Sequence, residues 1–209
     1  MHAREPMNGS RQRSRYDRIT EPVSYSQNSA DRSDGLSVSI LSRARGNSRK
    51  GRQSGLTYTI LRPTGFMEIW LGPHLGFDFA NAKATIYGSG ENKVSYISLH
   101  NVADFAVESV SNPAAQNAVL ELGGPHAFSQ FEVVRIFEEV SGRTFEKQFV
   151  SEEALKARKT AATNSVERTF ADLTLAAARG DMIDMRETFK KFSVHPRSVR
   201  EYAGTVMST

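Results

Sequence analysis

The chain has 209 residues, 39% of them hydrophobic and 24% charged, which suffices for one mid-sized domain with a packed core. It contains no cysteine, which excludes a disulfide framework, a thiolate zinc site and a cysteine nucleophile. No stretch approaches the roughly 20 apolar residues of a membrane-spanning helix, and the N-terminal residues lack the apolar core of a secretory signal. These features predict a cytoplasmic protein with no membrane partner.

The net positive charge is confined to the first quarter of the chain. Residues 1–53 hold 11 Lys and Arg against 5 Asp and Glu, whereas the remainder carries a small net negative charge. The same segment is rich in serine and poor in apolar residues, so burial cannot offset the entropy of ordering its backbone. We therefore predict a disordered basic leader over residues 1–53, with one strand-like stretch at 36–41, and an ordered domain over residues 54–209.

A basic leader raises the alternative of nucleic-acid binding, because Lys and Arg displace counterions from phosphate. Stacking on bases requires aromatic side chains among the cations, and Tyr16 and Tyr25 lie outside the Arg clusters. The acidic residues Glu5, Asp17 and Glu21 also depart from the composition of a mitochondrial transit peptide. A solvated leader without a nucleic-acid partner is therefore favoured.

Beyond residue 53 the hydrophobic pattern alternates between strand and helix periods. A strand is predicted at residues 56–61, ended by Pro63, followed by a short helix within residues 64–71. Residues 84–87 and 93–98 are predicted as two strands of a hairpin around the turn 88–92. A helix that ends before Pro113 follows, and its buried face is predicted to contain Val102, Phe105, Ala106, Ser109 and Val110.

The second half of the domain has clearer boundary signals. A strand at residues 118–122 leads into Gly123-Gly124, and Ser129 with Glu132 predicts a capping box for a helix that ends at Gly142. The predicted buried face of that helix comprises Val133, Val134, Phe137 and Val140. A strand within residues 144–150 and a helix capped by Ser151 come next.

Two more helices complete the predicted domain. Asn164 and Glu167 begin a long helix that ends at Gly180 and is predicted to turn Val166, Phe170, Leu173 and Ala177 inward. The last helix follows His195-Pro196 and is capped by Ser198 with Glu201. Alternating strands and helices indicate an α/β protein with added α+β material.

Four segments, in order, resemble the NmrA-like branch of the atypical short-chain dehydrogenase/reductase superfamily. They read SGLTYTILRPTGFME from Ser54, VSYISLHNVAD from Val94, LELGGP from Leu120 and HPRSVREYA from His195. The resemblance covers residues 54–209 and implies an NAD(P)-binding Rossmann protein. Members of that family reduce quinones or unsaturated carbonyl compounds with NADPH, and some only sense the dinucleotide.

One part of the family pattern is missing from the sequence. A Rossmann fold holds the pyrophosphate with a Gly-rich turn between its first strand and helix, and no G-x-G-x-x-G occurs here. Gly88-Ser-Gly90 lies between two predicted strands with no helix behind it. We therefore expect an α/β fold consisting of a partial Rossmann-like sheet, its N-terminal strands missing, and a small α+β C-terminal substrate domain. The missing segment favours a truncated, fused or mis-started product of such a protein. We expect it not to be competent alone and not to bind NADPH measurably.

The resemblance places a binding site in the loop after the strand at residues 56–61. Next to the nicotinamide of NADP or NAD it implies Pro63, Thr64, Gly65, Phe66 and Met67. Gly65 would let the ring approach closely, and Phe66 with Met67 would form an apolar wall. A Pro-terminated strand followed by a small packed helix explains the same residues equally well.

The same comparison implies a small-molecule substrate pocket lined by Trp70, His74 and Phe77. An imidazole such as that of His74 is a plausible proton donor, although a lone His is more often a surface or core residue. The usual proton donor of the superfamily, Tyr followed four residues later by Lys, is absent at all six tyrosines. The catalytic residues therefore stay unassigned.

The remaining polar clusters have structural explanations. His100 and Asn101 open a helix, Asp104 suits the field of its first turn, and Asp181 with Asp184 forms no metal-ligand set. No metal is predicted. If active, the protein is an NAD(P)H-dependent oxidoreductase; the alternative is a non-catalytic dinucleotide sensor or interaction module. The unpaired edge left by the missing strands predicts self-association.

Overall fold

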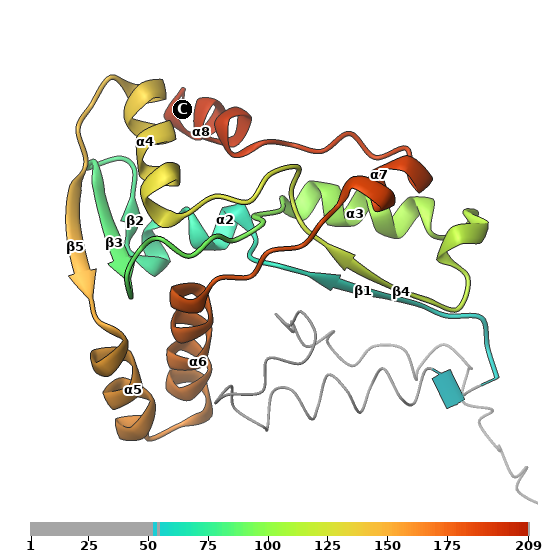
Figure 1. Cartoon of the computed structure of the whole chain (residues 1–209), viewed down its shortest axis with the longest axis horizontal. Coiled ribbons are helices and arrows are strands. Elements are labelled where there is room, and N and C mark those ends of the chain that lie inside the picture. Colours follow the sequence, from blue (N-terminus) through green and yellow to red (C-terminus); the bar gives the residue numbers. More distant parts are fainter. Residues whose placement is uncertain (1–51, 54, 209) are drawn as a thin grey trace, which may run out of the picture.

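A computed structural model describes residues 52, 53 and 55–208, and its fold confirms the predicted α/β class. Most of the predicted leader, including the strand-like stretch at 36–41, lies outside the described residues. Two small sheets form the framework, one with strand order β1-β4 and the other with order β2-β3-β5. They lie toward opposite ends of the described part of the chain, each with helices packed against it (Figure 1).

The first sheet is a parallel pair. β1 (Thr59–Pro63) runs beside β4 (Ala118–Leu122), in the position and with the bounds predicted for β4. Helix α3 (Leu99–Glu108) lies along this pair, and the 3-10 turn η2 (Pro113–Ala115) leads from α3 into β4. The short helix α7 (Arg186–Lys191) adds to the same hydrophobic core, which includes Phe66, Ile97, Phe105, Leu122, Met185 and Phe192.

Strand β1 differs from its prediction because it includes Pro63. The amides of Tyr58 and Thr64 donate toward the β4 side, to the Asn117 Oδ1 atom at 3.4 Å and to the Leu122 carbonyl at 2.9 Å. Amides alternate in direction along a strand, so those of residues 59, 61 and 63 face the opposite edge. Pro63 lacks an amide hydrogen at a position that faces away from β4, so no hydrogen bond between β1 and β4 is lost. The prediction that the strand ends before Pro63 is therefore wrong.

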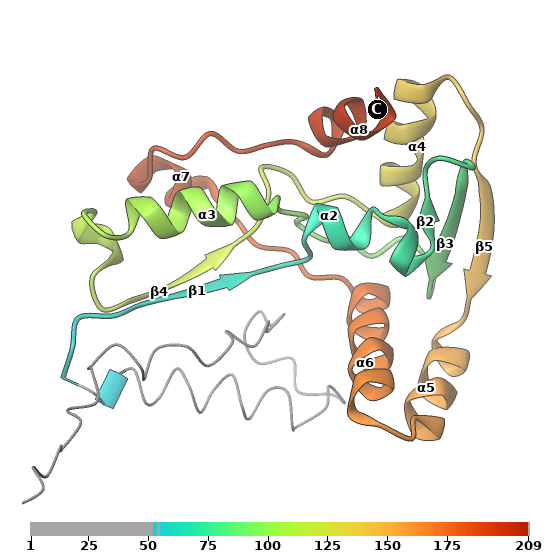
Figure 2. The ribbon, with the colours of Figure 1, turned by 180° about the vertical axis from the view of Figure 1, so that it is seen from behind.

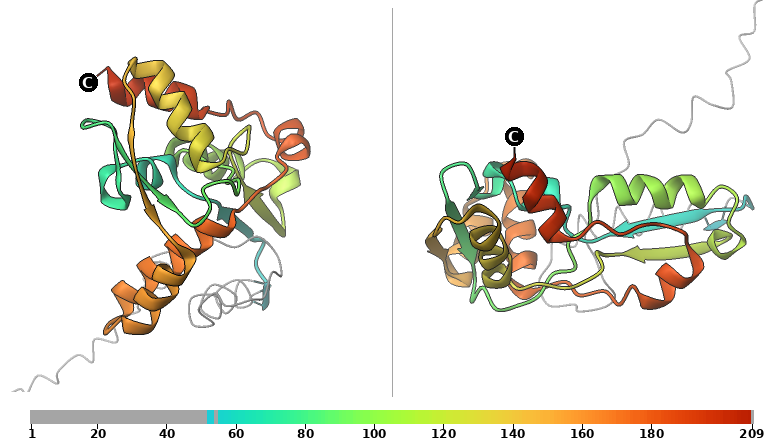
Figure 3. Two further views of the ribbon diagram at one scale, coloured as in Figure 1. Left: turned by 60° about the vertical axis from the view of Figure 1, so that its left-hand side comes forward. Right: turned by 90° about the horizontal axis from the view of Figure 1, so that it is seen from above.

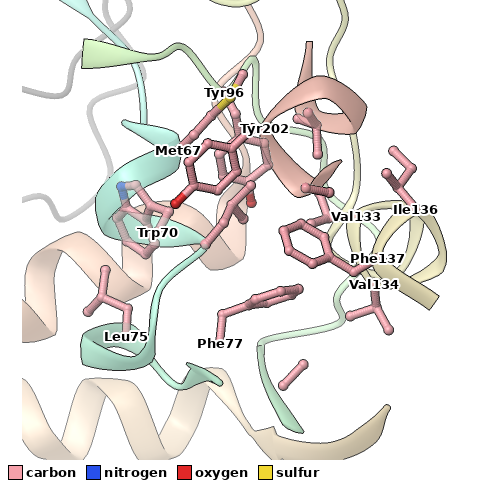
Figure 4. Packing of buried hydrophobic residues seen from close by; sticks show 14 of the residues in the cluster. Met67, Trp70, Leu75, Phe77, Tyr96, Val133, Val134, Ile136, Phe137 and Tyr202 are labelled. Carbon is pink, nitrogen blue, oxygen red and sulfur yellow. The ribbon is translucent and has the colours of Figure 1, made fainter. Parts of the chain in front are cut away.

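The second sheet is mixed. Its central strand β3 (Lys83–Tyr87) pairs antiparallel with β2 (Phe77–Asp78) and parallel with β5 (Glu146–Val150). Helices α4 (Gln130–Ser141) and α8 (Val199–Met207) pack together beside it, as the view from behind shows (Figure 2). Phe77 and Phe137 meet edge to face, with ring centroids 4.7 Å apart, near the middle of this core (Figure 4).

The hairpin predicted for residues 84–98 does not form. Both edges of β3 are already occupied, by β2 and β5, so residues 93–98 cannot pair with it. They cross instead to other parts of the chain, through single bridges from Val94 to Phe128 and Asp181 and from Ile97 to Phe66. Gly88 and Gly90 form the turn between β3 and this crossing segment.

Helices α5 (Glu152–Ala161) and α6 (Ser165–Arg179) form a helical pair that projects from the body of the protein (Figure 3, left). Their inner ends cover β3 and β5 through Tyr87, Leu155 and Leu175. An ion pair joins the two helices, with the partly exposed Lys159 Nζ atom 2.6 Å from the buried Asp172 carboxylate. Since a buried charge is costly without a partner, this pair fixes which faces of α5 and α6 meet.

Two predicted helix faces need correction. In α6 the residues Val166 and Phe170 are exposed, because the outer half of the helix extends beyond the sheet that its inner half covers. In α3 the buried side chains are Asn101 and Phe105, whereas Ala106 is exposed and Val110 lies beyond the helix end and is 89% exposed. Hydrophobic spacing predicted both helices, but it did not predict how much of each helix is covered by the rest of the protein.

The predicted helix starts at Ser129, Ser151, Asn164 and Ser198 are confirmed, each side chain accepting from a backbone amide of the first turn. Helix α4 has a complete capping box. The Ser129 hydroxyl accepts from the Glu132 amide at 3.2 Å, and the Glu132 carboxylate accepts from the Ser129 amide at 2.7 Å. Its end is also as predicted, with Gly142 in the left-handed region at φ 67°.

Replacing the cap residue by Ser129→Ala should lower the free energy of unfolding by about 1 kcal/mol, because the Glu132 amide loses its acceptor. Urea denaturation followed by circular dichroism measures the change. Ser193→Ala provides a matched control, since Ser193 is exposed and only its backbone amide takes part in a hydrogen bond. Equal stability of the two variants would show that the capping box contributes nothing to this fold.

Candidate functional site

The carboxyl ends of β1 and β4 meet at one edge of the parallel pair. Of the sequence-predicted site residues, Pro63 ends β1, residues 64–66 form the loop after it, and Met67 begins the next helix, α2 (Met67–Trp70). The loop after β4 contains Gly123 and Gly124. In open α/β sheets ligands bind outside the carboxyl ends of the strands, so this edge is the position where a ligand site is expected.

The crossing segment, residues 93–98, joins the two loops. The carbonyl of Ser95 accepts from the Thr64 hydroxyl and, at 3.1 Å, from the Gly124 amide. The amide of Ile97 donates to the Gly65 carbonyl at 3.0 Å, and the Ile97 carbonyl accepts from the Met67 amide at 2.9 Å. One short segment therefore fixes the positions of both loops.

The structure brings Thr64, Gly65, Phe66 and Met67 together inside the protein. Thr64 and Met67 are almost completely buried, Phe66 packs in the core around β1 and β4, and Pro63 is half-buried. Met67 turns instead into the core around the second sheet. The predicted cofactor residues thus form the junction between the two cores, and their role in binding nicotinamide stays a prediction.

A pocket lies beside this junction, between α2, the 3-10 turn η1 (Pro73–Leu75), β3 and α4. Of the predicted substrate residues, Trp70 and Phe77 line it, whereas His74 is exposed on η1 and lies outside the lining. The pocket encloses about 360 Å³ of space between atoms, including its open mouth. Its enclosed part admits about one water molecule. The lining is mostly apolar and comprises Trp70, Leu71, Leu75, Phe77, Thr85, Ile86, Tyr87, Tyr96, Gln130, Val133 and Ala177.

Polar groups in the lining come from residues that the sequence did not single out. Gln130 exchanges two hydrogen bonds with the backbone of Tyr87, at 2.8 and 2.9 Å, and the Tyr87 hydroxyl donates to the Leu75 carbonyl at 3.0 Å. Tyr96 is 4% exposed, and burial raises its pKa far above the usual range. Burial also raises the pKa of Tyr87. Tyr96 lies in the VSYIS motif that carries the family resemblance, and this position was the one signal in the sequence that could have indicated a role for Tyr96 in the site.

Asn101 proves to be a structural link between distant segments. Its side-chain amide donates to the His195 carbonyl at 2.8 Å, and its Oδ1 atom accepts from the Arg197 amide at 2.8 Å. The carboxylate of Glu68, in α2, accepts from the Leu99 amide at the start of α3 at 3.0 Å. These contacts hold the candidate site against the start of α3 and the segment before α8.

The Gly124→Ala variant should lose most of its stability, because a Cβ atom at this position would lie 1.9 Å from the Tyr96 carbonyl oxygen. The backbone would have to shift and break the Ser95–Gly124 hydrogen bond. Gly204→Ala is the matched control: it lies within α8 with open space around the added Cβ, so helix propensity should stabilise it by up to about 1 kcal/mol. Thermal unfolding measures both, and a Gly124→Ala protein as stable as the control would contradict the tight crossing.

The described part of the chain contains neither a helix long and apolar enough to cross a membrane nor a group of three or more His, Cys, Asp or Glu side chains that could hold a metal ion.

Comparison with known proteins identifies relatives of this arrangement. No protein-family model matches the chain. An isoflavone reductase homolog, A622 of Nicotiana glauca, is 34% identical over 104 residues, which are 47% of this chain and 33% of that protein. The photosystem II assembly factor Ycf39 of Synechocystis is 24% identical over 169 residues, 74% of this chain and 51% of that protein.

A solved structure supports the fold. The NADPH-dependent quinone oxidoreductase QOR2 of Escherichia coli, in complex with NADPH, superposes with a TM-score of 0.66 and 19% identity over 80% of this chain and 59% of that one. This chain spans about a third of the length of the isoflavone reductase homolog. The resemblance predicted from the sequence is confirmed at the level of likeness, because the chain is similar in sequence to isoflavone-reductase-like proteins and in fold to an NADPH-dependent reductase.

Proposed function

We propose that this chain is the substrate-facing portion of an NAD(P)H-dependent reductase that acts on quinones or small carbonyl compounds. One observation carries the proposal. The loops at the carboxyl ends of β1 and β4 are fixed side by side by the crossing segment, at the edge where open α/β folds bind ligands. A structural relative with this arrangement is an NADPH-dependent quinone oxidoreductase.

In this proposal the nicotinamide lies over the loop formed by residues 63–67. Gly65 would let the ring approach the backbone beside Phe66, and Met67, which is buried in the core around the second sheet, would support the loop from beneath. The substrate would bind beside Trp70 and Phe77. NAD(P)H, when bound, would supply a hydride to the carbonyl carbon or conjugated alkene, and a polar group of the pocket or a water molecule would supply the proton. The site of action in this proposal is the cytoplasm, a reducing compartment, where a protein without cysteine needs no disulfide for its stability.

Because the sequence has no G-x-G-x-x-G turn, the dinucleotide needs a Gly-rich strand–turn–helix segment in addition to these residues. We expect the chain alone to show no saturable NADPH binding. With the N-terminal half of the E. coli quinone oxidoreductase supplied in trans or as a fusion, 1,4-naphthoquinone should be reduced at the expense of NADPH, followed by absorbance at 340 nm. In that complex Gly65→Ala should lower the rate at least tenfold.

Gly204→Ala, which changes neither the loop after β1 nor the pocket lining, should keep the full rate in the same assay. Tight NADPH binding by the chain alone would overturn the proposal that a separate Gly-rich segment is needed to bind the dinucleotide. Equal rates for the Gly65→Ala and Gly204→Ala proteins would exclude the loop as the nicotinamide site.

A non-catalytic module is the second candidate function. It is favoured by the relative Ycf39, which is named an assembly factor and not an enzyme, and by the absence of the Tyr–Lys pair of the superfamily. A sensor would bind NADPH in the reconstituted complex without oxidising it, whatever quinone or enone is offered. NADPH consumption that depends on substrate separates the two functions.

We also propose that the chain associates with itself through β1. Among the described residues no strand pairs with the edge of β1 opposite β4, and the amides of Thr59 and Leu61 face that edge. An unpaired strand edge is a template for pairing with another chain.

Light scattering coupled to size exclusion should therefore detect a dimer whose fraction rises with protein concentration. Thr59→Pro removes one amide from the open edge and should reduce the dimer fraction severalfold, without loss of an amide that faces β4. Thr59→Val retains that amide and is the control, since both variants lose the bond from the Thr59 hydroxyl to the Ala115 carbonyl. A monomer at all concentrations, or equal dimer fractions in both variants, would reject pairing at this edge.

A further inference from the structure

The pocket beside the predicted nicotinamide loop contains an unused hydrogen-bond donor. Tyr96 lines the pocket and is 4% exposed, yet no described residue hydrogen-bonds to its hydroxyl group. Among the described residues, the Tyr96 hydroxyl is also not one of the side-chain atoms that are both sealed from solvent and without a hydrogen-bond partner, so it retains some access to the pocket. A buried polar group without a partner is costly, so a hydroxyl that reaches only a pocket points to water or a ligand there.

The polar groups of Gln130 and Tyr87 in the lining are committed to the protein. The side-chain amide of Gln130 exchanges two hydrogen bonds with the backbone of Tyr87, and the Tyr87 hydroxyl donates to the Leu75 carbonyl. Thr85, whose side chain packs against Gly76, is the remaining hydroxyl of the lining. Tyr96 is therefore the phenol available to orient a molecule in this pocket.

The composition of the lining restricts the chemistry of the ligand. None of the lining side chains is charged. A carboxylate or phosphate would lose its hydration here without gaining a counterion, so a charged ligand is strongly disfavoured. Burial raises the pKa of Tyr96, which keeps its hydroxyl protonated at physiological pH as a donor and makes it a weak acid.

We propose that Tyr96 binds the carbonyl oxygen of a small neutral substrate, whose apolar body lies between Trp70 and Phe77. The enclosed part of the pocket holds about one water molecule, which matches one oxygen atom of a ligand while the rest occupies the mouth. Figure 4 shows Tyr96 and Trp70 in the same cluster as Phe77, next to Met67 of the predicted nicotinamide loop. The substrate class rests on the proposed reductase function, whereas the binding site itself does not.

The chain supplies its own reporter for this site, because Trp70 is its one tryptophan. The full chain is titrated with 2-cyclohexen-1-one, a small neutral enone, without any cofactor, and Trp70 emission is recorded. N-acetyltryptophanamide corrects for collisional quenching. We expect a saturable change in emission, and no saturable change with cyclohexene, which lacks the oxygen, or with benzoate, which is charged.

Tyr96→Phe should weaken enone binding about three- to tenfold, which is the effect of losing one hydrogen bond between neutral groups. Tyr202→Phe is the matched control, because Tyr202 is buried in the same core but does not line the pocket. It should bind as the wild type does. Circular dichroism and the thermal midpoint establish that both variants fold.

Unsaturable quenching by the enone, binding of cyclohexene as tight as that of the enone, or equal weakening by both tyrosine variants would overturn the inference. The comparison of the three probes needs no variant, so it decides even if Tyr96→Phe fails to fold. Enone binding without NADPH oxidation in the reconstituted complex would leave the Tyr96 site intact and reject the proposed reductase. Reduction of the substrate at the same rate in the Tyr96→Phe protein would support the proposed reductase and reject the role of Tyr96.

Discussion

The fold depends on the hydrogen bonds of the crossing segment, residues 93–98. Its backbone bonds to the loop after β1 through Gly65 and Met67, to the loop after β4 through Gly124, and to Phe128 and Asp181 beyond them. Buried backbone groups must find partners, and this segment satisfies those of several separate loops at once. It therefore locks the parallel pair β1-β4 to the second sheet, and it places Tyr96 in the core around the second sheet and Ile97 in the core around β1 and β4.

The regular elements with local signals were predictable from the sequence. The capping box at Ser129, the end of α4 at Gly142 and the strand at Ala118–Leu122 follow from side-chain chemistry and short-range pattern, and the structure confirms them. The family resemblance rested on motifs in a fixed order, and the relatives confirm it. Such features depend on neighbouring residues or on the order of motifs, so they can be predicted without knowledge of tertiary contacts.

What the sequence could not supply are facts about partners distant along the chain. Residues 93–98 have strand-like composition, but β2 and β5 already occupy both edges of β3. Val166 and Phe170 have helical spacing, but α6 extends beyond the surface it covers. For the candidate site, the sequence named Trp70 and Phe77 of the pocket lining, and it missed Tyr96 because a tyrosine in a strand-like segment is ordinarily a packing residue.

Pro63 has a consequence for any chain that adds to the open side of β1. An incoming strand finds amide donors at Thr59 and Leu61 but none at Pro63, so its ladder must stop before the end of β1. Docking along this side is thereby limited in extent and register. The loop that follows β1 would stay uncovered by an added strand, and association of two molecules would leave access to that end of the sheet unobstructed.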